Sequence, residues 1–84
     1  MKPQNEKELH TMLLEALELE VVGEPNTPAL VGRVRLMLKG ALYQAGVRNP
    51  KIYIQQKNNV LQVRIQYPAG PKRVQTLQLS THLI

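Results

Sequence analysis

Apolar residues in the first part of the chain recur every three or four positions, the spacing of one face of an α-helix. This pattern predicts a helix over residues 5–22. The apolar stripe consists of Leu9, Met12, Leu13, Ala16 and Leu17. Asn5 and Glu8 have the spacing of a capping box, so the helix should begin there. Gly23 and Pro25 should end it.

A second stripe with the same period predicts a helix over residues 28–46. Thr27 suits the N-cap position, and Pro28 suits the first turn because its missing N–H would have no partner there. Gly46 suits the C-terminal end. The face expected to meet the core consists of Leu30, Val34, Met37, Leu38, Ala41 and Ala45.

The remaining chain alternates between apolar and polar residues, which predicts strands over residues 51–57, 60–67 and 73–81. Asn58-Asn59 and the segment "PAGP" are typical of turns, so consecutive strands should pair antiparallel. The residues expected to face inward are Ile52, Ile54, Leu61, Val63, Ile65, Tyr67, Leu77 and Leu79. The predicted fold class is α+β: two N-terminal helices packed on one face of a three-stranded antiparallel β-meander, in one small domain.

Charge is divided unevenly along the chain, whose formal net charge is +5. All six acids are glutamates at or before position 24. The bases after that point are Arg33, Arg35, Lys39, Arg48, Lys51, Lys57, Arg64, Lys72 and Arg73. This asymmetry indicates a polyanion or an acidic partner. The alternative is that the glutamate-rich helix packs beside the basic part and partly neutralises it.

Residues suited to catalysis are few. General acid–base catalysis uses a carboxylate or histidine in a cleft, whereas every acid here lies on or beside the first helix. His10 follows Glu6 by four residues, which an ordinary helix-surface pair explains. The chain has no cysteine and two histidines far apart, which do not make a zinc site. We therefore predict no enzymatic activity, no metal and no other cofactor.

The opening segment "MKPQNEKELH" lacks the apolar run of a signal peptide, and no stretch has the length and hydropathy of a membrane span. These observations predict a cytoplasmic protein without a membrane partner. A chain of 84 residues buries only about 60–65% of its unfolded surface, so we also expect a homodimer.

The outward positions of the predicted sheet carry cations, amides and one aromatic ring, but no acid. Arginine and lysine can bind phosphates, amides can contact bases and sugars, and Tyr53 can stack on an unpaired base. We therefore predict a nucleic-acid-binding domain, for DNA or RNA. The expected contact residues are Lys51, Tyr53, Lys57 and Arg64 on the sheet, Lys72 and Arg73 after the "PAGP" turn, and Arg35 and Lys39 on the second helix. A solvated antiparallel face also needs polar residues, so the pattern has a purely structural explanation as well.

A contrasting hypothesis is a protein-interaction module, either a homodimer or an assembly factor. Leu36 and Tyr43 lie seven residues apart on a side of the second helix away from its core stripe. They form either a patch that faces a partner or a site covered by the sheet. The apolar C-terminus "HLI" would complete the contact surface, and the positive charge would steer an acidic protein.

Overall fold

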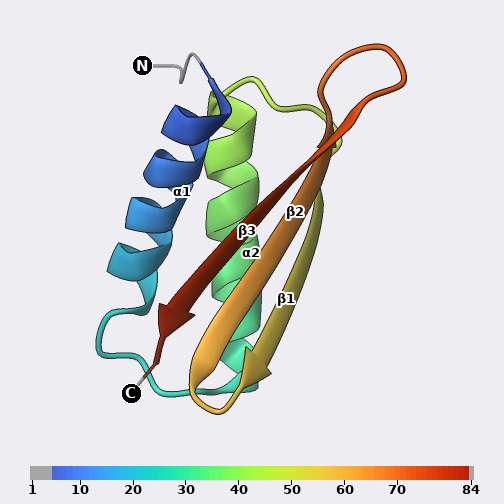
Figure 1. Ribbon diagram of the computed structural model, residues 1–84. Coiled ribbons are helices and arrows are strands. Elements are labelled where there is room, and N and C mark those ends of the chain that lie inside the picture. Colours follow the sequence, from blue (N-terminus) through green and yellow to red (C-terminus); the bar gives the residue numbers. More distant parts are fainter. Residues whose placement is uncertain (1–4, 84) are drawn as a thin grey trace.

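The fold was determined as a computed structural model, which describes residues 5–83. Its elements follow the order helix, helix, strand, strand, strand (Figure 1). The bounds are α1 Glu6–Val21, α2 Pro28–Gln44, β1 Lys51–Lys57, β2 Val60–Pro68 and β3 Val74–His82. The predicted α+β class and the α-α-β-β-β order are therefore confirmed.

The strands form one antiparallel sheet of order β1-β2-β3. A two-residue turn joins β1 to β2, and both its residues, Asn58 (φ 53°) and Asn59 (φ 60°), adopt the left-handed backbone of a type I′ hairpin. This turn fixes the pairing, and hence which side chains share a face. On the inner face, Ile52, Ile65 and Leu77 form one row across the sheet. Ile54, Val63 and Leu79 form the next row.

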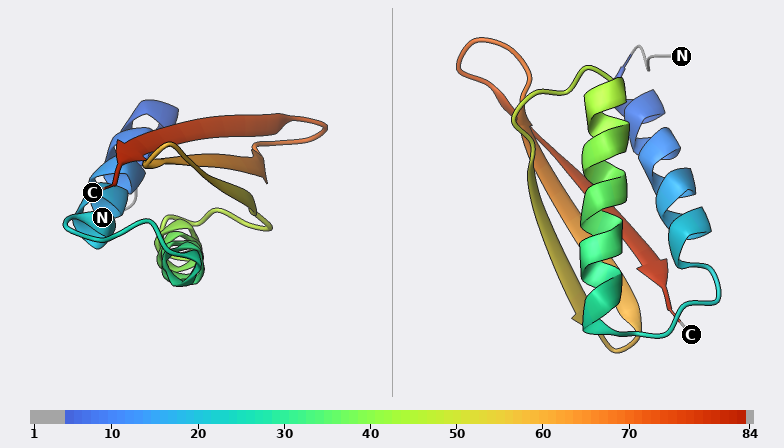
Figure 2. Two further views of the ribbon diagram at one scale, coloured as in Figure 1. Left: turned by 90° about the horizontal axis from the view of Figure 1, so that it is seen from below. Right: turned by 180° about the vertical axis from the view of Figure 1, so that it is seen from behind.

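Both helices cover the same side of the sheet, and the other side stays open (Figure 2). α1 packs against α2 and β3, and α2 packs against β1. Every fourth residue along the core side of each helix is buried. The buried helix residues are Leu9, Leu13, Leu17 and Val21 in α1, and Leu30, Val34, Leu38 and Leu42 in α2. Met12, Met37, Ala41 and Ala45 of the predicted stripes are half-buried and pack around this core.

The helix ends follow the predicted signals with one exception. The Asn5 side chain accepts a hydrogen bond from the Glu8 N–H (2.8 Å), as a capping box requires. Thr27 occupies the N-cap of α2, but its hydroxyl makes no capping bond. Gly46 (φ 83°) follows the C-cap residue, and the next N–H, that of Val47, returns to the Leu42 carbonyl (2.9 Å). This is the Schellman arrangement, in which glycine is favoured because it adopts a positive φ without strain.

The C-terminal segment does not form the exposed apolar surface expected from "HLI". Leu83 is buried in the core, and its N–H donates to the Asn59 carbonyl (2.7 Å), which ties the chain end to the β1–β2 turn. His82 is exposed, and Ile84 lies outside the described residues. The prediction that Leu83 belongs to a C-terminal contact surface is therefore wrong, because this side chain is part of the core.

Polar side chains from three elements bind backbone carbonyls and hold the layers together. Arg35 of α2 donates to the Ile52 carbonyl of β1 (2.7 Å), and the His10 Nε2 of α1 is 2.9 Å from the Gln78 carbonyl of β3. Gln56 of β1 donates to the Thr27 carbonyl (2.9 Å). β1 and β3 are the sheet edges, where backbone groups lack a neighbouring strand. Each helix thus supplies a partner to the edge nearer to it.

Candidate nucleic-acid interface

The outer face of the sheet carries two complete rows of polar side chains across its centre. Tyr53, Arg64 and Gln78 lie opposite one another on the three strands. The adjacent row is Gln55, Gln62 and Ser80. All six residues are exposed. They alternate along each strand with the core residues described above, so the packing that buries the inner face determines which way this outer set points.

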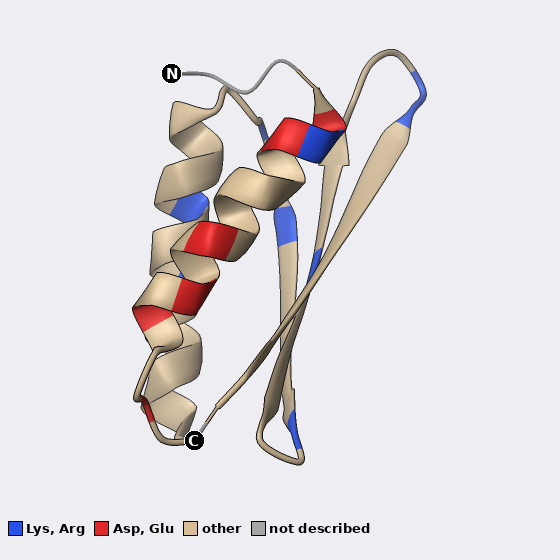
Figure 3. Ribbon diagram, turned by 60° about the vertical axis from the view of Figure 1, so that its left-hand side comes forward, with Lys and Arg blue, Asp and Glu red and all other residues tan. Residues whose placement is uncertain are grey.

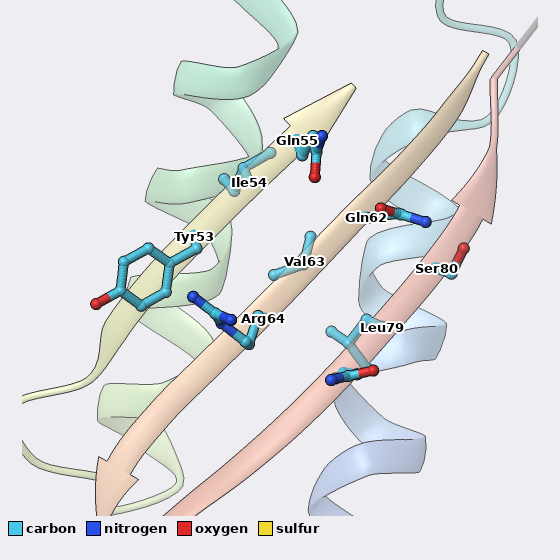
Figure 4. Close-up of a pocket in the computed structure, with 9 residues that line it drawn as sticks. Tyr53, Ile54, Gln55, Gln62, Val63, Arg64, Leu79 and Ser80 are labelled. Atoms are coloured by element: carbon cyan, nitrogen blue, oxygen red, sulfur yellow. The ribbon is translucent and has the colours of Figure 1, made fainter. Parts of the chain in front are cut away.

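Tyr53 and Arg64 form a preassembled pair at the centre of this face. The Arg64 guanidinium carbon lies 4.7 Å from the centroid of the Tyr53 ring. The two side chains point toward one another from neighbouring strands (Figure 4). The tyrosine remains 45% exposed, so much of the ring is still open to solvent. The pair is therefore a cation–aromatic contact with room for a third group.

The centre of this face is hollow. A shallow cavity of about 520 Å³ lies over the two polar rows (Figure 4). Backbone and side-chain atoms of β1, β2 and β3 all contribute to its lining. Within it, Arg64 is the one charged side chain, and the other polar groups are neutral amides and hydroxyls. The cavity thus offers hydrogen-bond donors and acceptors together with one aromatic ring.

Two lysines flank the hollow along the same strand. Lys51 and Lys57 are exposed at the two ends of β1, on the face that Tyr53 occupies. Six residues of extended chain separate them by about 20 Å. The centre of the outer face therefore has Arg64 as its one cation among neutral polar groups and one aromatic ring, and a lysine lies at each end of β1.

The β2–β3 loop carries the next pair of cations. Lys72 and Arg73 are exposed in this loop, which extends beyond the end of the helical layer (Figure 1). Two backbone hydrogen bonds close the loop. The Arg73 N–H donates to the Gly70 carbonyl (3.2 Å), and the Ala69 N–H donates to the Arg73 carbonyl (3.1 Å). Gly70 (φ 137°) and Lys72 (φ 60°) take the positive backbone angles that the turn needs. Both cations thus sit on a defined loop at one end of the sheet.

The acidic residues lie away from the outer face. They gather on α1 and in the loop after it, whereas most of the bases lie on α2, the α2–β1 loop, the strands and the β2–β3 loop, and Lys7 is the base on α1 within residues 5–83 (Figure 3). The ion pairs within residues 5–83 join Arg33 of α2 to Glu20 (3.4 Å) and Glu24 (3.0 Å). The hydrogen bond and charge of Glu24 raise the pKa of Arg33 above its usual value. Internal neutralisation therefore occurs at Arg33, on the helical side of the molecule.

The predicted helix cations differ in environment. Arg35 and Lys39 were both expected to contact nucleic acid, but Arg35 is half-buried against the edge of β1 and is not open to solvent as Lys39 is. Its guanidinium is held by the Ile52 carbonyl, because the helix packs beside that strand. Lys39 is exposed and lines a second groove of about 410 Å³ with Tyr43 and Arg48. Arg48 was absent from the predicted set, since a single loop arginine has no periodic signal that assigns it to a surface.

Leu36 and Tyr43 are open to solvent. Their side chains are 74% and 82% exposed, so the sheet does not cover them. Two helix glycines, Gly32 and Gly40, lie on the same side of α2, and nothing lies within 4 Å of the position that a Cβ would take at either. The strip of α2 that carries Gly32, Leu36, Gly40 and Tyr43 thus has no charged side chain of its own and is open to solvent within residues 5–83.

Other site types find little support in the described part of the chain. Residues 5–83 contain no group of three or more histidine, cysteine or acidic side chains arranged to hold a metal ion. None of the helices in this range combines the length and hydropathy needed to cross a membrane. A scan against protein-family models, a search of curated proteins and a search of solved structures each gave no match.

Proposed function

We propose that this protein is a small, non-catalytic nucleic-acid-binding domain that uses the outer face of its sheet. The observation that carries the proposal is the Tyr53–Arg64 pair, open to solvent on a face without acids and flanked by Lys51 and Lys57. Lys72 and Arg73 extend the same positive surface at the loop. Arg35 is left out of this interface because its guanidinium already binds the backbone of β1.

Each part of the face has a distinct role in this proposal. The lysines and the loop cations bind phosphates, which releases counterions and makes affinity depend on salt. The glutamines and Ser80 contact base edges or sugars through neutral hydrogen bonds. Tyr53 offers a ring for stacking. Affinity therefore comes mainly from the cations, and orientation comes from the centre of the face.

Binding measured against salt concentration tests the proposal. The wild-type domain should bind generic oligonucleotides at low salt, with a log–log slope of several units. Lys51→Ala and Lys57→Ala should each lower that slope by about 0.7–0.9. Arg33→Ala is the matched control, because it removes the same charge from the helical side, where Glu20 and Glu24 already pair it. Absence of binding at low salt, or an equal loss in the Arg33 variant, would reject the outer face as the interface.

The exposed side of α2 supports a second candidate function, association with a second copy of this chain. In an antiparallel pair of α2 helices centred on Leu36, residues whose numbers sum to 72 face each other. Gly40 then meets Gly32, which allows the helices to approach closely, and Tyr43 meets the small Ala29. Lys39 meets the partner's Arg33, whose charge is already paired by Glu20 and Glu24. This pairing would bring the glycines of the two helices together and place Lys39 beside the Arg33–Glu20–Glu24 ion pairs of the second copy.

Glycine substitution separates this role from simple helix stability. Gly40→Ala should raise the stability of the monomer by about 0.5–1 kcal/mol, since alanine is the better helix former and the added methyl group meets no atom. The same methyl group should weaken the dimer by preventing close approach of the helices. For this one variant, urea unfolding should therefore show a more stable monomer, and sedimentation equilibrium should show a weaker dimer.

Leu36→Asp provides the stronger disruption, and Leu19→Asp is its control because Leu19 is 77% exposed on α1. Only the Leu36 variant should lower the average mass in solution. A wild-type protein that stays monomeric at high concentration would reject self-association and leave this side of α2 to a different partner.

A further inference from the structure

The centre of the outer face is built for bases more than for phosphates. Of the side chains around the hollow, Arg64 alone is charged, and Gln55, Gln62, Gln78 and Ser80 are neutral. Phosphate oxygens are bound best by cations, whereas base edges present donors and acceptors that amides can match. The cations of this face lie at its ends, at Lys51 and Lys57. A nucleic acid seated here therefore places its bases over the middle and its phosphates along the margin.

The shape of the face restricts how those bases can be presented. In a duplex the base edges lie at the bottom of grooves, and proteins reach them with a protruding helix or a two-stranded ribbon. The outer face is hollow, with about 520 Å³ of open space over its centre, so it cannot enter a groove. An unpaired base, in contrast, projects from its backbone and can fill a hollow.

The Tyr53–Arg64 pair supplies a stacking surface in that hollow. An aromatic ring and a guanidinium plane both stack on bases with little dependence on sequence. Here the two groups are already in contact at 4.7 Å, across directly paired strand positions. Because each group already restrains the other, little side-chain conformational entropy remains to be lost on binding.

We propose that the outer face binds single-stranded in preference to duplex nucleic acid, with a base stacked on the Tyr53–Arg64 pair and phosphates held at Lys51 and Lys57. This inference rests on the proposed nucleic-acid-binding function and specifies its substrate class. RNA and DNA share the chemistry involved, namely an unpaired base on a polyanionic backbone. The β2–β3 loop, by contrast, protrudes beyond the helical layer (Figure 1).

Fluorescence anisotropy with matched oligonucleotides tests the preference. The probes are an oligouridylate and an oligothymidylate of about 12 nucleotides, a length within the known range of single-strand sites, and a blunt duplex of equal length. We expect both single strands to bind at least about tenfold more tightly than the duplex at low salt. Equal affinity for the two single strands indicates contact with shared groups, and tighter RNA binding indicates contact with the 2′-hydroxyl.

Variants show which surface is responsible. Tyr53→Ala should weaken single-strand binding by about 5- to 150-fold, the range observed when a stacking residue is removed. Tyr53→Phe should retain most of the affinity. Tyr43→Ala is the matched control, because it removes a tyrosine that is 82% exposed on α2. Circular dichroism of each variant establishes that the fold is intact.

The possible results separate this inference from the function on which it rests. Failure of every probe to bind rejects the nucleic-acid function itself. Binding to the duplex that equals or exceeds single-strand binding, and that depends on Lys72 and Arg73 but not on Tyr53, keeps that function and overturns single-strand selectivity. Equal losses in the Tyr53→Ala and Tyr43→Ala variants also overturn it, because they exclude a specific role for the sheet.

Discussion

The two faces of the three-stranded sheet differ in their surroundings: the inner face packs against the helices, and the outer face meets solvent. On the inner face, Ile52, Ile65 and Leu77 form a row whose members all pack against other apolar side chains. On the outer face, one position further along β1 and one position back along β2, Tyr53 and Arg64 contact each other and solvent. The same strands thus carry one face that is buried in the core and one face that stays exposed to solvent.

The difference teaches where stability and binding can be separated. Inner residues gain about 25 cal/mol for each square ångström removed from water, and a lost methyl group leaves a cavity as well. An exposed cation–aromatic pair contributes only about 0.5–1 kcal/mol. The stability of the fold therefore depends mainly on the inner rows. Substitutions on the outer rows should alter binding while the domain remains folded.

Substitution of adjacent residues of β2 should give the largest contrast. Ile65→Ala truncates a fully buried side chain of the central strand and should lower the free energy of unfolding by about 2–5 kcal/mol. Arg64→Ala should lower it by about 1 kcal/mol or less. Urea unfolding of both variants measures the difference. Similar losses in the two variants would contradict the assignment of the faces.

Arg35 and Lys39 offer the next contrast, between a cation used by the fold and one left free. Arg35→Ala removes a charged donor from the Ile52 carbonyl and should cost about 1.5–3 kcal/mol, the range for hydrogen bonds to charged groups. Lys39→Ala should change stability by less than about 0.5 kcal/mol, because this side chain is exposed. Thermal unfolding followed by circular dichroism distinguishes the two. If Arg35→Ala instead lowered nucleic-acid affinity without a loss of stability, Arg35 would have to be added to the residues of the proposed interface.

Periodicity was sufficient to predict the fold class and the order of the elements. Period-two alternation in residues 60–67 separates Leu61, Val63 and Ile65 from Gln62 and Arg64, and a one-residue slip would exchange the two sets. Helical spacing likewise identified Leu13 and Leu38 as core residues. These inferences succeed because they depend on local geometry alone.

The residues that the sequence did not assign correctly depend on tertiary contacts. Leu42 was not among the residues expected to meet the core, but it is fully buried and belongs to the core cluster. Arg35 and His10 were placed on helix surfaces, whereas each reaches a carbonyl of an edge strand. The sequence placed Tyr53 and Arg64 on one face, but their contact depends on a register set by the β1–β2 turn.

That turn is the basis of the third prediction. Asn58 and Asn59 both have positive φ angles, which asparagine tolerates and alanine does not. Asn59→Ala should therefore cost about 1–2 kcal/mol, whereas Asn59→Gly should be neutral or stabilising. Chemical denaturation measures both variants. A larger loss, with altered amide resonances throughout β1, would show that the substitution has also shifted the register that this turn sets, and with it the division into inner and outer faces.

Tyr67 lies at the end of the inner face and gives the smallest predicted effect. Burial, with a smaller contribution from the charge of Glu6, raises the pKa of the Tyr67 hydroxyl above its ordinary value of 10.0. The unfolded chain then loses this proton at a lower pH than the folded chain does, so the contribution is complete below about pH 10 and is lost as pH rises through the folded pKa. Because Tyr67 is only half-buried, solvent screens this effect, and the change should be the smallest of those predicted here. Urea unfolding of the wild type and Tyr67→Phe, at about pH 8 and about pH 11, should show the steeper loss in the wild type. Parallel losses would show that this end of the inner face is as open to solvent as the outer face.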